Sequence, residues 1–145
     1  MRKRRGSNRD HEWRLSRRGR LAASGRIPNR GLGGWRLGRW TFPGEDLPVK
    51  YAKYFSSVIA VDSAHKRVLP NLLNRFLLNK ESKLEYGKDG SLTLYFAPTQ
   101  ATGAPEGNWL PTLRSKGYSL TFRFYGPRGG VADGTYYPPA LQMVR

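Results

Sequence analysis

The sequence predicts an all-β fold, an antiparallel sandwich or barrel, preceded by a basic segment that lacks regular structure. Two observations predict it. After residue 40, short runs of alternating apolar and polar residues recur between glycine- and proline-rich turns, and no long segment keeps the 3.6-residue period of a helix. The chain has 145 residues, enough for one domain, and the part after residue 50 can form one core of this kind.

Residues 1–40 are expected to form a disordered basic tail, and residues 41–145 a folded module. The first 39 residues contain twelve arginines, one lysine and two acids, so they carry +11 of the net charge of +16. Glycines interrupt their few apolar residues, and so little burial cannot offset roughly 1 to 2 kcal/mol of backbone entropy per ordered residue. A second interpretation is a misplaced start or a shifted frame, because GC-rich DNA translated in an unselected frame has this composition.

The first elements of the module are an extended lead-in, a strand, a loop and a hairpin. Residues 41–50 contain two prolines, which favour extended backbone. Tyr54 to Val61 alternates with apolar side chains on both faces, which is typical of a strand with neighbours on both sides. Val68 to Leu78 mixes helical spacing with asparagines and is predicted to be an irregular loop with one helical turn at most. Residues 83–86 and 91–97 flank two glycines and are expected to pair as a hairpin.

The later elements are predicted to be strands joined by a turn. Residues 118–125 show the clearest alternation, with one face in the core and Arg123 on the opposite face. A turn at 126–134, a short strand at 135–137 and a closing strand at 140–144 complete the module. The core face of the 118–125 strand consists of Tyr118, Leu120, Phe122 and Phe124.

Four segments, in this order, resemble one bacterial family. They read DGSLTLYF (89–96), GNWLP (107–111), LTFRFYGP (120–127) and DGTYYPP (133–139). Together they resemble the C-terminal module of the proteins with domain of unknown function 1254/1214, specifically the 1214 half, from about Leu47 to Val144. The resemblance implies a jelly-roll-like β-sandwich that follows an N-terminal 1254 module. No segment here resembles that module, so the chain is expected to be a truncated or frame-disrupted member, and the family supplies no catalytic residue.

Two candidate sites in the module each have a structural alternative. The amide of Asn108 is expected to bond loop backbone while Trp109 fills the core; as a ligand site, the pair would form a pocket mouth with an aromatic wall. Arg123 is expected to pair with an aspartate, Asp133 or Asp62; as an anion receptor, it would act with residues of the 68–78 loop. The pocket candidates are Asn74, Arg75, Asn108, Trp109, Arg123, Tyr125 and Asp133.

Composition argues against most catalytic sites. Without cysteine there is no disulfide, cysteine-based zinc site or thiol nucleophile, and two histidines far apart leave little for metal or proton-transfer chemistry. We therefore expect no metal, no cofactor and a module that is noncatalytic by itself, packing on a 1254-type partner domain or a second copy, or forming one wall of a ligand cleft. No apolar run approaches a membrane span, and no secretory signal is present. Family members often carry export signals, so export would require a different start.

Two alternatives of other classes remain open. One is a small-anion-binding hydrolase that uses Arg75 and Arg123. The other is nucleic-acid binding through the tail, because clustered guanidinium groups neutralise phosphates and release counterions. The arginines for this function are Arg4, Arg5, Arg14, Arg17, Arg18 and Arg20.

The nucleic-acid hypothesis predicts binding to random-sequence DNA that weakens steeply as salt rises, because counterion release drives it. A salt series measured by fluorescence anisotropy checks this. Affinity that survives deletion of residues 1–45 would rule out the tail, and no binding at low salt would leave it without support.

Overall fold

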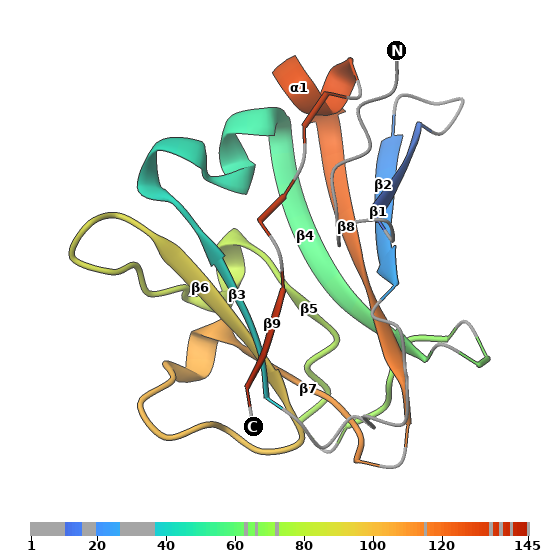
Figure 1. The fold of residues 1–145 in the computed structure, drawn as a ribbon, viewed down its shortest axis with the longest axis vertical. Helices are drawn as coiled ribbons and strands as arrows, with labels where there is room; N and C mark the ends of the chain where they lie inside the picture. Colours follow the sequence, from blue (N-terminus) through green and yellow to red (C-terminus); the bar gives the residue numbers. More distant parts are fainter. Residues whose placement is uncertain are drawn as a thin grey trace.

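The structure, a computed structural model, describes residues 11–15, 20–26 and 37–144 apart from positions 63, 66, 72, 115, 134, 137 and 140. Only the backbone is described for the first two segments and for residues 80, 119 and 143. Two β-sheets face each other with the core between them (Figure 1). The β-sandwich predicted from the alternating pattern is therefore confirmed.

The first sheet has five strands in the order β1-β2-β8-β4-β5, and every neighbouring pair is antiparallel. Its long central strands, β4 and β8, match the two strands that the alternation predicted most clearly. β4 pairs with β8 on one side and β5 on the other, as expected for a strand that is apolar on both faces. The bounds are β1 His11–Leu15, β2 Arg20–Arg26, β8 Tyr118–Pro127, β4 Ala52–Asp62 and β5 Leu77–Leu78.

The second sheet has the strand order β7-β6-β3-β9, and it departs from the predicted antiparallel pairing at one place. β6 and β7 run parallel, with Tyr95 opposite Trp109. Parallel neighbours need a crossover of about a dozen residues, and the loop that follows β6 is long enough to supply it. The bounds are β7 Trp109–Pro111, β6 Leu92–Ala97, β3 Leu37–Phe42 and β9 Gln142–Val144.

The helices are single turns between strands. Helical turns occupy the predicted lead-in, and α1 lies in the predicted 126–134 turn, whereas the 68–78 loop has no helix at its described positions. The described residues of the expected 135–137 strand, Thr135 and Tyr136, are not in a strand. None of the helices in the described part of the chain is long and apolar enough to cross a bilayer. The turns are η1 Gly44–Asp46, η2 Pro48–Tyr51, η3 Lys80–Ser82, η4 Glu106–Asn108 and α1 Gly129–Ala132.

Strands also occur within residues 1–40. β1 and β2 lie there, and β3 begins at Leu37, so Trp40 is part of the core. The structure thus differs from the expected boundary at residue 41. Sequence periodicity did not reveal β3 because Gly38 occupies one of its three buried positions, so only Trp40 and Phe42 show the apolar alternation of a strand.

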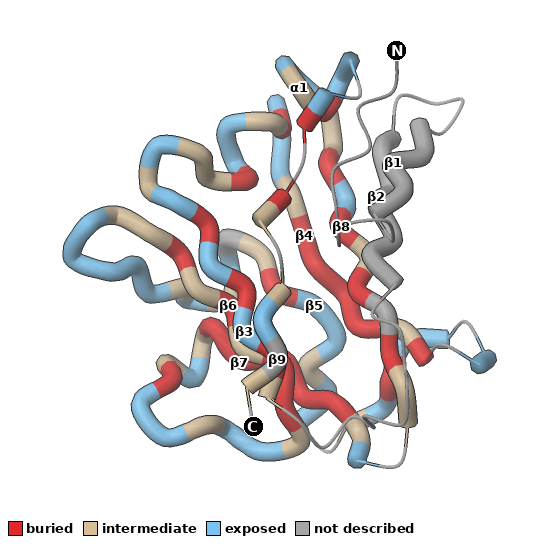
Figure 2. The backbone as a smooth tube through the Cα atoms, in the orientation of Figure 1, coloured by how far each residue is buried: buried red, intermediate tan, exposed pale blue. Residues whose placement is uncertain are grey.

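The core lies between the inner faces of the two sheets, where buried residues gather (Figure 2). The predicted core face of β8 is buried at all four positions. Phe122 lies at its centre: its ring centroid is 5.6 Å from that of Trp40, 5.9 Å from that of Phe42 and 4.6 Å from that of Phe124. Trp40 and Phe42 belong to β3 of the other sheet, so this aromatic cluster joins the two layers.

Replacing Phe122 with alanine should lower the free energy of unfolding by about 3 to 5 kcal/mol, because the ring is buried and a cavity would remain. Urea unfolding followed by tryptophan fluorescence measures the change. Phe122→Leu, which keeps most of the volume, should cost much less, about 1 kcal/mol. Equal losses for the two variants would contradict the cavity explanation.

Candidate functional site

The side chain of Asn108 is held by hydrogen bonds to the backbone of two residues, Glu85 and Thr93. This side chain is 2% exposed, accepts a hydrogen bond from the Glu85 amide (2.8 Å) and donates to the carbonyl oxygens of Glu85 (2.8 Å) and Thr93 (2.8 Å). Gly107 allows this close approach, because a Cβ there would overlap the carbonyl oxygen of Lys83. The amide therefore binds β6 and the chain segment that precedes it, and not the 98–107 loop that the sequence favoured.

Trp109 is buried beside this amide, and its indole Nε1 donates to the Ala97 carbonyl oxygen at 2.9 Å. Arg75 lies over its ring, with the guanidinium carbon 5.9 Å from the ring centroid. The same guanidinium donates to the backbone oxygens of Glu106 (2.5 Å) and Trp109 (3.3 Å) and forms an ion pair with the Glu106 carboxylate (3.2 Å). Arg75, Asn108 and Trp109 are thus brought together, in contacts that tie the 68–78 loop to β7.

Asn74 comes directly before Arg75 in this loop and has a left-handed backbone with φ of 51°. The loop is closed by Asn71, whose side chain accepts from the amides of Leu73 (3.1 Å) and Arg75 (3.0 Å) and donates to the Arg75 carbonyl oxygen (2.7 Å). These contacts fix the backbone that carries Arg75.

Arg123 and Tyr125 belong to β8 and take no part in these contacts. They belong to the face of β8 that points away from the second sheet, since Phe122 and Phe124 point into the core. Tyr125 stacks on Phe55 of β4, with centroids 4.1 Å apart. Because Arg75 bonds to β7 of the other sheet, the structure does not bring Arg75 and Arg123 together.

The aspartates expected to pair with Arg123 have other partners. Asp62 is buried and accepts hydrogen bonds from Lys116 Nζ (2.9 Å) and His65 Nδ1 (3.0 Å), which hold the pKa of its carboxyl well below the usual value. Asp133 accepts from the Thr135 hydroxyl (2.5 Å) and amide (2.9 Å), and these bonds lower its pKa. The predicted pairing was therefore wrong, because the 62–65 turn and Lys116 supply closer donors.

The outward side of the five-stranded sheet carries apolar side chains, and we call Phe55, Ile59, Leu77, Arg123 and Tyr125 the outer face, although Ile59 is only 6% exposed. The pairing register places them on one side: Phe55 is opposite Tyr125, and Ile59 is opposite Leu77. Phe55 is 40% exposed and Leu77 41% exposed, and Arg123 is also exposed. The outer face thus combines apolar surface with one cation.

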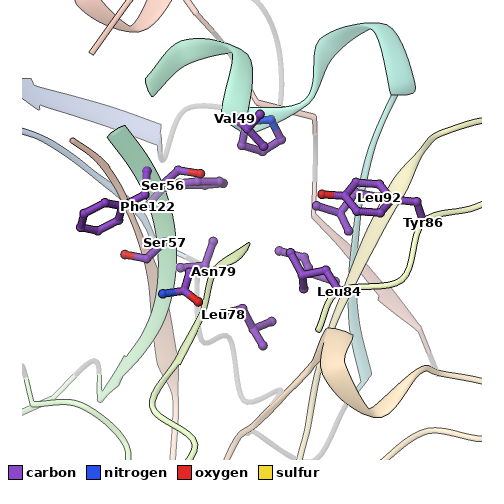
Figure 3. Close-up of a pocket in the computed structure, with 13 residues that line it drawn as sticks. Val49, Ser56, Ser57, Leu78, Asn79, Leu84, Tyr86, Leu92 and Phe122 are labelled. Atoms are coloured by element: carbon purple, nitrogen blue, oxygen red, sulfur yellow. The ribbon is translucent and has the colours of Figure 1, made fainter. Parts of the chain in front are cut away.

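A cavity of about 60 Å³ opens between the sheets, on the core side of β4. Its walls come from segments far apart in the sequence: Val49 of η2, Ser56 of β4, Leu78 of β5, and Leu84 and Leu92 around β6 (Figure 3). None of the predicted pocket residues lines it. Sequence reasoning missed it because most wall residues are apolar residues of strands and turns that look like ordinary core residues in the sequence.

The tail candidates can be placed only in part. Arg4, Arg5, Arg17 and Arg18 lie outside the described residues, and for Arg14 and Arg20 the structure gives only the backbone positions in β1 and β2. Deletion of residues 1–45 would also remove β3 and its buried Trp40. Replacing Arg4, Arg5, Arg17 and Arg18 with glutamine is therefore the cleaner test of the tail. Among the described residues, no cluster of three or more His, Asp or Glu side chains could hold a metal ion.

Comparison with known proteins gives a family and a fold. The model of the family described as protein of unknown function (DUF1214) matches residues 35–129. The crystal structure of the VPA0106 protein from Vibrio parahaemolyticus is similar, with a TM-score of 0.64 and 24% identity over 78% of this chain and 27% of that one. An uncharacterized protein from Burkholderia cenocepacia has a TM-score of 0.53 and 16% identity over 90% of this chain and 31% of that one. No curated protein matches.

Asn108→Ala should lower the free energy of unfolding by at least about 2 kcal/mol, because three backbone groups lose the hydrogen bonds that they make to a buried side chain. Chemical denaturation measures the loss. Asn71→Ala is the matched control: it also removes three hydrogen bonds to backbone, but at a half-buried position where water can replace them, so it should cost about 1 kcal/mol. A larger loss for Asn71→Ala would contradict the role of burial.

Proposed function

Because this chain belongs to the DUF1214 family of proteins of unknown function, we propose that its β-sandwich is a noncatalytic module that packs on a 1254-type domain. The docking surface is the outer face. The proposal assigns the sandwich a structural role beside a second folded unit, with any ligand chemistry shared between the two.

The observation that carries this proposal is the composition of the outer face. Phe55 of β4 and Leu77 of the edge strand β5 each leave about two fifths of their surface exposed. Exposed apolar side chains grouped on one face of a sheet are typical of interaction sites. The stacked pair of Phe55 and Tyr125 would provide a rigid aromatic anchor, the type of group that contributes most to binding energy at interfaces.

The solved structures support a second unit. This chain spans only 27% and 31% of the two structures compared with it, so in those proteins the sandwich fold is accompanied by further chain.

The charge of the outer face sets a requirement for the partner surface. Arg123 is exposed at the centre of the outer face, so the partner surface should place a carboxylate opposite it.

The described residues support a noncatalytic role for the module by itself. The candidate polar side chains make hydrogen bonds and ion pairs within the fold. Asn108 bonds to backbone groups, Arg75 holds its loop against β7, and Asp62 binds Lys116 and His65. A hydrolase that used Arg75 and Arg123 would need both at one site, whereas Arg75 is bonded to β7 of the four-stranded sheet and Arg123 lies on the outward face of β8.

The chain and a separately expressed 1254-type domain from the same genome should form a complex in sedimentation velocity. Combining Leu77→Lys with Arg123→Glu should weaken it at least about tenfold, because the variant buries a charge and reverses another. Tyr86→Lys is the control, since Tyr86 is 48% exposed but belongs to the other sheet, and it should leave the affinity unchanged.

Two outcomes would overturn the proposal. One is that the wild-type chain and the 1254-type domain sediment separately. The other is that the chain alone forms a dimer that the Leu77→Lys and Arg123→Glu substitutions dissociate, which would make a second copy the occupant of the outer face.

A further inference from the structure

We propose that the cavity between the sheets is a binding site for a small uncharged ligand that has one apolar ring or branched alkyl group and one hydroxyl or carbonyl group. The cavity lies mainly on the core side of β4, and Phe55 is the one outer-face residue that also lines it. The inference rests on the size and the walls of the cavity and does not depend on the docking of a second domain.

The size of the cavity supports a ligand larger than water. Its volume of about 60 Å³ is several times the roughly 10–15 Å³ that a single water molecule needs on the same kind of measure. This space is suited to one small ring or branched chain. Well-packed cores rarely contain empty spaces larger than a water molecule. A cavity of this size between the two sheets is therefore more typical of a ligand-binding site than of a packed core.

The walls determine the chemistry of that occupant. None of the 13 described residues that line the cavity carries a charge, and most are apolar. A carboxylate or ammonium group in this position would lose its hydration without gaining a partner, which is costly. The cavity therefore selects against ions. It also lacks Arg75 and Arg123, so it is not the anion site considered from the sequence.

Two hydroxyl groups stand at the opening. Figure 3 shows the oxygens of Ser56 and Tyr86 turned toward the space between β4 and the segment before β6. Ser56 is half-buried and Tyr86 is exposed, so a ligand atom between them would be partly shielded from water. A hydroxyl group can donate and accept, which suits a neutral alcohol or carbonyl. Asn79 is less suited, because its side-chain oxygen already accepts from the Glu81 amide (2.9 Å).

Cyclohexanol and cyclohexanecarboxylate test the inference with one ring and two charge states. Titrated into the full chain labelled at its leucine methyl groups, cyclohexanol should give saturable shifts at Leu78, Leu84 and Leu92. The carboxylate should bind at least about tenfold more weakly, because its charge has no partner in the walls.

A pair of valine substitutions gives the control. Val49 is 57% exposed at the opening and Val68 is 42% exposed outside the cavity, so both should accept a tryptophan without a change in the fold. Val49→Trp should cover the opening and reduce cyclohexanol affinity at least about tenfold, whereas Val68→Trp should leave it unchanged. The inference is overturned if cyclohexanol gives no saturable shifts up to its solubility, if the carboxylate binds equally well, or if both variants behave alike.

Discussion

Contact between the aromatic rings of Phe122, Trp40 and Phe42 is the interaction on which the sandwich depends. It joins β8, the centre of one sheet, to β3, the centre of the other. Each sheet alone would leave its apolar side in water, and burial between the layers is the main favourable term available to a module of this size. The outer face and the cavity are both positioned by this contact, since they lie on the two sides of β4, the neighbour of β8.

The sequence predicted those strands whose own residues alternate between apolar and polar over the full length of the strand. β8 alternates over a full strand length, so its core face could be assigned from residues alone. β7 could not be predicted, because three residues that end in proline have no period, and its parallel pairing depends on a loop that carries the chain across the sheet. The expected start of the fold came after the first residues of β3, because Gly38 at a buried position leaves only Trp40 and Phe42 to show the apolar alternation.

The candidate site was less predictable, because sequence indicates residue types but not what surrounds them. Asn108 and Trp109 were recognised as unusual, and Arg75 was found over the same ring. The partner of Arg123 was assigned wrongly, since Asp62 meets Lys116, a residue 54 positions later, through a contact that no local pattern indicates. The cavity gave no signal, because leucines and valines from separate segments look like core residues until their packing is known.

The pairing of β3 with β9 brings residues about 100 positions apart into one ladder, and the Trp40 indole donates to the Pro139 carbonyl oxygen across a separation of 99 residues. During synthesis on the ribosome, β3 therefore emerges long before its partner and must wait with one edge unpaired. Such long-range pairing slows folding and exposes intermediates to aggregation. A nascent chain of this kind is a natural client for chaperones that bind exposed strands.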